Sequence, residues 1–303
     1  MRRHSFLNVC LVTAVLIGFP ATQAAEPLVG KLVSTGSDTL GALTSIWAEM
    51  LTARHSRVAM QVRAIGSGAA PTALTQGTAD IGPMSRPMSP DEINAFSRKY
   101  GYQPTAIPVA EDALAVFVHR NNPLDSITTA QLDAVFSSTR RCGFPATIRD
   151  WGVLGLSAPW GRRVISVYGR SAASGTYSVF RRQVLCSGDF AVYLNRLVGS
   201  SAVVRAVAMD VNGIGYASAG YLNASVKQLR VVQNDGVQEA VLSRRLFVYI
   251  NRPPKAPIDA LTAAFLEVAF SAEGQREVSR LGYGELGKSE LARLRSKLGL
   301  DDA

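Results

Sequence analysis

One local pattern recurs three times in this chain and constrains its fold more than any other feature: a strand-like run, a turn of small polar residues and a helical repeat. The turns occupy residues 34–39, 66–71 and 170–176. Each preceding run favours a strand, and each following run spaces its apolar residues at helical intervals. Strands that alternate with helices in this way are typical of α/β proteins. We therefore expect an α/β fold in which Gly, Ser and Thr follow several strand ends.

The third turn, Arg170 to Thr176, has the features of an oxyanion site. The first amides of a helix have no partner within it and lie at the positive end of the helix dipole. Arg170 adds a positive charge and a planar set of donors that suits phosphate or carboxylate. For one such turn alone, a capped helix beside a surface arginine is an equally simple interpretation.

The recurrence of the turn favours a ligand site over that simpler interpretation. Open α/β sheets bind ligands beyond the carboxyl ends of their strands, so three such turns can face one point. Their amides and hydroxyls, together with Arg170, would form a cage that satisfies a tetrahedral anion. Glycines 66, 68 and 175 would let the backbone approach the ligand closely.

Two further helix starts carry the capping-box pattern, a hydroxyl residue followed three positions later by Glu or Gln. These are Ser89 with Glu92, and Thr128 with Gln131. Residues 140–160 are rich in Gly, Pro and Trp and are expected to form a loop.

The first 24 residues have the features of a secretory signal peptide. Arg2 and Arg3 precede an apolar run over residues 6–19, and small residues lead to a cleavage site expected after Ala24. No later run approaches 18 uninterrupted apolar residues, so no membrane span is expected. The mature protein is expected to be soluble and either periplasmic or secreted.

Removal of the signal peptide leaves two cysteines, Cys142 and Cys186. In an oxidising compartment they most simply form one disulfide, worth about 4 kcal/mol in the chain-entropy model. Two buried thiols are the alternative. No histidine neighbours either cysteine, so we expect no metal site.

The net charge of +9 favours anionic partners. The basic residues are scattered rather than gathered in a stripe studded with aromatics, which argues against nucleic acid. We interpret four arginine pairs as solvated faces, at positions 140–141, 162–163, 181–182 and 244–245.

These motifs resemble those of the periplasmic phosphate-binding receptors of bacterial phosphate ABC importers. The resemblance spans most of the chain after the signal peptide and is carried by residues 35–40, 64–68, 79–82 and 170–176. Its most specific element is the last, an arginine followed after three residues by Ser-Gly-Thr.

The resemblance implies a two-lobed periplasmic-binding-protein fold, in which each lobe is a mixed sheet flanked by helices and the ligand lies in the cleft between the lobes. Lobe 1 would contain residues 25–117 and 246–303, and lobe 2 residues 118–245. Residues 113–119 and 246–251 resemble the strands that cross the hinge.

It also implies a function: the capture of inorganic phosphate and its delivery to the membrane permease of an ABC importer, by a monomer that needs no cofactor and is not an enzyme. The positions that match the family's phosphate contacts are Thr39, Leu40, Ser67, Ser85, Arg170, Ser174, Gly175 and Thr176.

One position departs from the family pattern. Many members have an aspartate where this chain has Ser85, and that carboxylate is thought to accept the proton of hydrogen phosphate and so to reject sulfate. Asp38 is the preferred substitute acceptor, with Asp80 as the alternative. Ser37 or Asp38 is also expected to cap the first helix, and Arg86 is expected to add a second positive charge to the site.

Two functions of other classes remain open on the sequence. A secreted serine hydrolase or phosphatase could use a serine flanked by glycine, although no Gly-x-Ser-x-Gly motif occurs and no base with an orienting acid is evident near Ser174. Surface adhesion or matrix binding by a basic exported protein would need no pocket.

Overall fold

The structure is a computed structural model and describes residues 27–240 and 242–300. The predicted signal peptide and its cleavage site after Ala24 lie outside these residues. Within them, Cys142 and Cys186 form a disulfide with their Cα atoms 5.6 Å apart, so the predicted bond is confirmed.

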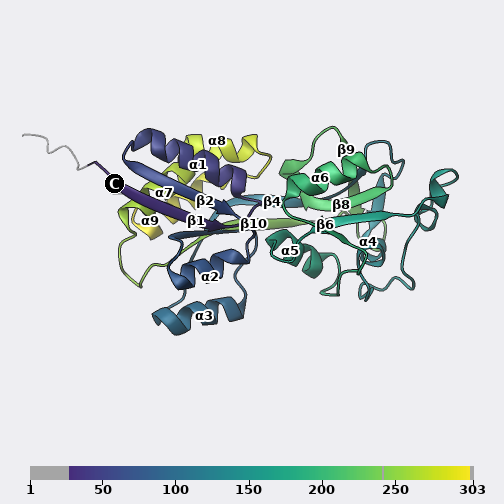
Figure 1. Cartoon of the computed structure of the whole chain (residues 1–303), viewed down its shortest axis with the longest axis horizontal. Helices are drawn as coiled ribbons and strands as arrows, with labels where there is room; N and C mark the ends of the chain where they lie inside the picture. The colour runs from purple at the N-terminus through teal and green to yellow at the C-terminus, as the bar shows by residue number, and fades with distance from the viewer. Residues whose placement is uncertain (1–26, 241, 301–303) are drawn as a thin grey trace, which may run out of the picture.

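The molecule has two lobes, seen side by side in Figure 1. The core of lobe 1 combines apolar residues from both ends of the described chain, residues 32–110 and 246–300. The core of lobe 2 lies between residues 114 and 242. Each lobe therefore has an apolar core of its own, as separate domains do.

Lobe 1 is a sheet covered by helices on both faces (Figure 1). Strands β1 and β2 are parallel, β3 lies parallel to β1 on its other side, and β10 runs antiparallel to β3. Helices α1, α7 and α8 pack together on one face, while α2 and α3 pack on the other. The bounds of these elements are β1 Gly30–Gly36, α1 Gly41–Arg54, β2 Val58–Ala64, α2 Ala69–Gln76, β3 Ile81–Met84, α3 Pro90–Tyr100, β10 Ser243–Ile250, α7 Ala260–Phe270, α8 Ala272–Arg280 and α9 Lys288–Leu298.

Lobe 2 continues the sheet. Strands β8 and β9 run antiparallel to β4, β6 is parallel to β8 and β7, and β5 is parallel to β9. Residues 140–160, expected to be a loop, are irregular apart from short 3-10 turns. The elements are β4 Thr105–His119, β5 Ser126–Thr128, α4 Thr129–Phe136, η1 Trp151–Leu154, η2 Trp160–Arg162, β6 Ser166–Arg170, α5 Gly175–Gln183, β7 Asn195–Leu197, α6 Ser200–Met209, β8 Gly213–Ser218, η3 Ala219–Tyr221 and β9 Val226–Val232.

Strand β4 passes from one lobe to the other beside β10. Its first part pairs with β10 as far as Ala113, and its second part pairs with β8 from Leu114 onward. The strand is longer than the predicted 113–119, because it begins at Thr105. The charged residues Glu111 and Asp112 interrupt its apolar pattern, so the sequence pattern predicted only the second half of the strand.

Both predicted capping boxes are confirmed. The Ser89 hydroxyl accepts from the amide of Glu92 at the start of α3, and Thr128 and Gln131 do the same at α4. None of the helices described is both long and apolar enough to cross a bilayer.

Candidate functional site

The three Gly/Ser/Thr turns predicted from the sequence meet where the lobes face each other. The hydroxyls of Thr39, in the first turn, and Thr176, in the third, are 3.1 Å apart. The amide of Gly68, in the second turn, donates to the carbonyl of Ala173 at 3.0 Å. Turns from lobe 1 therefore contact the β6–α5 turn of lobe 2 directly.

Two glycines permit this close approach. A Cβ atom at Gly66 would lie 2.7 Å from the Ala173 carbonyl oxygen, and the residue has a φ of +117°, which side chains rarely adopt. A Cβ atom at Gly175 would lie 2.5 Å from the Ser85 hydroxyl and 2.6 Å from that of Ser67. Any larger residue at either position would push the turns apart.

Five hydroxyl groups of the site are buried. The Ser67 hydroxyl accepts from the Ser85 amide at 3.0 Å and lies 3.1 Å from the Ser85 hydroxyl. The Ser174 hydroxyl caps α5 by accepting from the amide of Thr176 at 3.1 Å. None of the five residues is more than 1% exposed: Thr39, Ser67, Ser85, Ser174 and Thr176. A hydroxyl that accepts one hydrogen bond keeps a proton to donate, so the cluster is rich in donors.

Arg170 is a cation in contact with this cluster and is fully buried. Its Nη1 donates to the Ser200 hydroxyl at 2.7 Å and to that of Thr176 at 3.4 Å. Its Nη2 pairs with the carboxylate of Asp38 from the opposite lobe. Its Nε has no hydrogen-bond partner among the described residues. A buried donor without a partner is costly, and an anion is a partner that would satisfy it.

The electrostatics of Arg170 agree with this interpretation. Burial lowers the pKa of its guanidinium, while the nearby carboxylate of Asp38 partly offsets that effect. Arginine nevertheless stays charged in proteins. Arg170 is thus a buried positive charge, paired with Asp38 and, within the described chain, with its Nε still free to bind an anion.

The first turn begins its helix differently from the prediction. Neither Ser37 nor Asp38 is the N-cap of α1; Leu40 holds that position and has no side-chain cap. The prediction was wrong because the Asp38 carboxylate is already engaged by Arg170 and by the amide of Thr39. Ser37 contributes only a long contact, accepting from the Leu40 amide at 3.4 Å.

The backbone of this turn is held by two tyrosines that no sequence motif singled out. The hydroxyl of Tyr283 donates to the Thr39 carbonyl at 2.6 Å, and that of Tyr221 to the Asp38 carbonyl at 3.2 Å. Burial raises the pKa of both tyrosines, which therefore remain protonated donors at neutral pH.

Arg86, expected as the second cation of the site, is committed elsewhere. It forms two hydrogen bonds of 2.7 Å with Glu92 at the start of α3. Burial alone would raise the pKa of Glu92, but hydrogen bonds from Arg86 and Ser89 hold that pKa below its ordinary value. Asp80, the alternative proton acceptor, instead accepts from the amide of Val33 at 2.7 Å.

Arg244 occupies the place expected for a second cation. The interpretation of residues 244–245 as a solvated pair was wrong for Arg244, which is only 8% exposed. Its Nη2 donates to the Thr176 hydroxyl at 2.9 Å, and its Nη1 to the Ser85 carbonyl at 3.1 Å. Successive strand residues point to opposite faces, so on a strand covered on one side only one of the two arginines could have been solvated.

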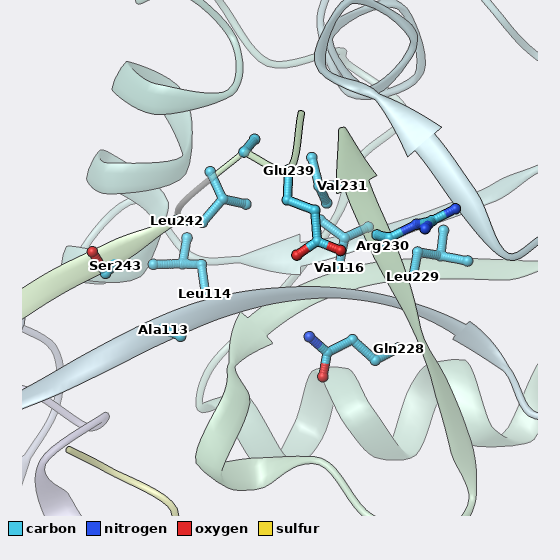
Figure 2. A pocket seen from close by; sticks show the side chains of 11 residues that line it. Ala113, Leu114, Val116, Gln228, Leu229, Arg230, Val231, Glu239, Leu242 and Ser243 are labelled. Atoms are coloured by element: carbon cyan, nitrogen blue, oxygen red, sulfur yellow. The ribbon is translucent and has the colours of Figure 1, made fainter. Parts of the chain in front are cut away.

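A separate pocket of about 530 Å³ lies on lobe 2 (Figure 2). Apolar side chains dominate its wall, with Glu239 and Arg230 as the charged members. Ala113 and Ser243 line it, and they neighbour Asp112 and Arg244 on paired strands. Leu114, Val116 and Leu242 line the pocket as well, so residues from both faces of these strands contribute to its wall.

The fold is that of known binding proteins. A family model described as a PBP superfamily domain matches residues 21–273. The chain superposes with a TM-score of 0.70 on a putative phosphate ABC transporter substrate-binding protein from Clostridium perfringens, at 24% identity over 85% of this chain and 100% of the other. An ABC-type phosphate transport receptor from Vibrio cholerae gives a TM-score of 0.64, at 22% identity over 84% and 100%. Fold and site thus define a two-lobed binding protein, as predicted.

A nearer relative specifies the family. The phosphate-binding protein PstS of Pseudomonas aeruginosa is 43% identical over 301 residues, which cover 95% of this chain and 93% of the relative. The protein SphX of Synechococcus elongatus is 28% identical over 82% of this chain and 76% of its own length. The chain therefore belongs to the family of the phosphate-binding protein PstS, within the PBP superfamily.

Membership in a family of binding proteins does not support the hydrolase alternative. The histidines of the described chain, His55 and His119, lie at the end of α1 and at the end of β4, and neither forms a hydrogen bond with Ser174. Among residues 27–240 and 242–300, no three His, Cys, Asp or Glu side chains gather as a metal ion would require.

Proposed function

We propose that this protein is exported, binds inorganic phosphate between its two lobes as a monomer, and delivers it to the membrane permease of an ABC importer. The observation that carries the proposal is the fully buried Arg170, which has an uncommitted Nε and contacts Thr176, whose hydroxyl lies 3.1 Å from that of Thr39 in the other lobe. The relatives that bear phosphate-binding names support the same ligand.

The proposed contacts come from three turns. Thr39 and the amide of Leu40 would bind from the first turn, Ser67 from the second, and Ser85 from the end of β3. On the facing lobe, the contacts would come from Arg170, Ser174, Gly175 and Thr176. A dianion held this way is surrounded by donors and shielded from water, where charge-assisted hydrogen bonds are strongest.

Lobe closure would complete the site. Lobe 1, proposed as residues 25–117 and 246–303, supplies the first two turns. Lobe 2, proposed as residues 118–245, supplies the third. An ion between them gains contacts from both lobes only when they close, so binding and closure are coupled.

Asp38 is the carboxylate that we propose as acceptor for the proton of hydrogen phosphate, in place of an aspartate at Ser85. It is the carboxylate paired with Arg170 inside the cluster. Asp112, the other carboxylate beside the site, pairs with Arg244 and Ser218 on the strands that join the lobes, whereas Asp38 lies in the first turn itself. Sulfate has no proton to donate at neutral pH, so an acceptor at Asp38 disfavours it.

Isothermal titration with phosphate and with sulfate, from pH 5 to pH 8, tests both proposals. We expect saturable phosphate binding and weaker sulfate binding. In Asp38→Asn we expect the difference between the two affinities to become smaller. Equal affinity for both anions in the unaltered protein would remove Asp38 from this role but keep the oxyanion cage. Failure of the folded protein to bind either anion would reject phosphate capture and favour matrix binding.

A further inference from the structure

Arg244 is fixed by partners on the strands that join the lobes. It lies opposite Asp112 in the pairing of β10 with β4. Its Nε and Nη2 both donate to the Asp112 Oδ2 atom, at 2.9 and 2.7 Å, and the Ser218 hydroxyl donates to the Oδ1 atom at 2.6 Å. The side chain of Asp112 is fully buried. This carboxylate, itself held by Ser218, fixes the guanidinium in place.

The fixed guanidinium determines which way the hydroxyl of Thr176 points. A hydroxyl group has one proton to donate and two lone pairs that accept. Arg244 donates to the Thr176 oxygen at 2.9 Å, and Arg170 donates to it at 3.4 Å. Because both lone pairs are occupied by cations, the proton of Thr176 must point away from them, toward Thr39 at 3.1 Å or toward an anion between the turns.

We infer that Arg244 is a positioning residue of the anion site: anchored by Asp112 and Ser218, it holds the Thr176 hydroxyl as a hydrogen-bond donor to the bound anion. The inference rests on the proposed binding of phosphate at this site. It assigns a role to a residue outside the three turns, on the strand that links the lobes.

A second contact of Arg244 links the two sides of the cleft. Its Nη1 donates to the carbonyl of Ser85 in lobe 1, while its Nη2 reaches Thr176 in lobe 2. One side chain on β10 therefore holds both the Ser85 carbonyl and the Thr176 hydroxyl. Loss of Arg244 would free the Thr176 hydroxyl to rotate and would remove a fixed positive charge from the site.

The test is a double-mutant cycle on phosphate affinity, measured by isothermal titration with inorganic phosphate. Arg244→Gln is combined with Thr176→Val, which removes the hydroxyl and nearly keeps its shape. We expect Arg244→Gln to weaken binding roughly tenfold or more in the unaltered protein, as for a hydrogen bond to a charged group. In the Thr176→Val background we expect Arg244→Gln to lower phosphate affinity by less than about threefold, because the hydroxyl that Arg244 positions is gone.

Arg245→Gln is the matched control. Arg245 neighbours Arg244, but its side chain is 46% exposed and pairs with Glu290 on the surface. We expect the affinity of Arg245→Gln for phosphate to stay within about twofold of that of the unaltered protein. Thermal unfolding of each variant, with and without phosphate, establishes that every affinity belongs to folded protein.

The outcomes separate this inference from the proposed function. Tight phosphate binding by the unaltered protein with no loss in Arg244→Gln would overturn the role of Arg244 and leave the function standing. An equal loss in both backgrounds would show that Arg244 acts independently of Thr176 and would also overturn it. Should Arg244→Gln fail to fold, Arg244→Lys in the same cycle provides the comparison. Failure of the unaltered protein to bind phosphate would overturn both proposals.

Discussion

Two buried Arg–Asp pairs lie in the middle of this molecule, and they differ in what they connect. Arg170 and Asp38 come from turns of opposite lobes, with side chains 0% and 9% exposed. Arg244 and Asp112 face each other on the adjacent strands β10 and β4, with side chains 4% and 0% exposed. The first pair depends on the lobes being closed, whereas the second is part of the sheet that joins them.

The pairs also differ in the donors that they leave available. All three nitrogens of the Arg244 guanidinium have protein partners. Arg170 keeps an unpartnered Nε among the described residues. The comparison separates two tasks for buried arginines: Arg170 is suited to binding an anion, and Arg244 to holding the groups around it.

The largest expected effect is on stability, in Asp112→Ala. This change leaves Arg244 as an uncompensated buried charge, which typically costs about 3–5 kcal/mol. Asp38→Ala should cost clearly less, because opening of the lobes can return Arg170 to water. Urea denaturation of both variants measures the difference in unfolding free energy. Equal losses would contradict the distinction between a closure-dependent pair and a pair built into the sheet.

The next effect is on binding, in Arg170→Ala. We expect phosphate affinity to fall by about 2 kcal/mol or more, because a charge-assisted contact of the anion is lost. Isothermal titration measures the change, with Arg245→Gln as the control for total charge. An unchanged affinity would remove Arg170 from the site. It would also contradict the distinction between Arg170 as the anion-binding arginine and Arg244 as the positioning one.

Gly175→Ala tests whether the turns must touch. The added methyl group would overlap the hydroxyls of Ser67 and Ser85, so we expect closure to be hindered at a cost of about 1–2 kcal/mol in phosphate binding. Gly287→Ala, where a Cβ meets nothing within 4 Å, is the control. Wild-type affinity in Gly175→Ala would show that the ligand is bound with these turns farther apart.

The smallest effect is predicted for Glu92→Gln, which removes the carboxylate that pairs with Arg86. Because the pKa of Glu92 is lowered in the folded protein, its ionised form stabilises the fold at neutral pH. That advantage over Glu92→Gln should shrink as the pH falls through the lowered pKa. Thermal unfolding of both proteins at pH 7 and pH 3 measures this stability difference. We expect the phosphate affinity of Glu92→Gln at pH 7 to equal that of the unaltered protein. An advantage independent of pH would contradict the charge-based account.

Local sequence patterns predicted the features that depend on local physics. The three strand–turn–helix units and the capping boxes at Ser89 and Thr128 are set by neighbours a few residues apart, and the structure has them where they were expected. Arg170 stood out for the same reason, since its charge, a strand end and a helix start are adjacent in the chain.

The features that were missed depend on contacts between distant segments. Arg244 is separated from Asp112 by 132 residues, and no local pattern reveals that β4 and β10 place them opposite each other. Arg86 was selected because it neighbours Ser85, yet its guanidinium is engaged by Glu92 at the start of α3. The Asp38 carboxylate did not cap its helix because a guanidinium from the other lobe engages it.

A crystal structure of the protein with bound phosphate tests the central claim most directly. The account predicts one phosphate between the lobes, within hydrogen-bond distance of Arg170, the Thr176 hydroxyl and the turn that contains Ser67. A phosphate bound at another place, with these three groups facing different surfaces, would contradict it.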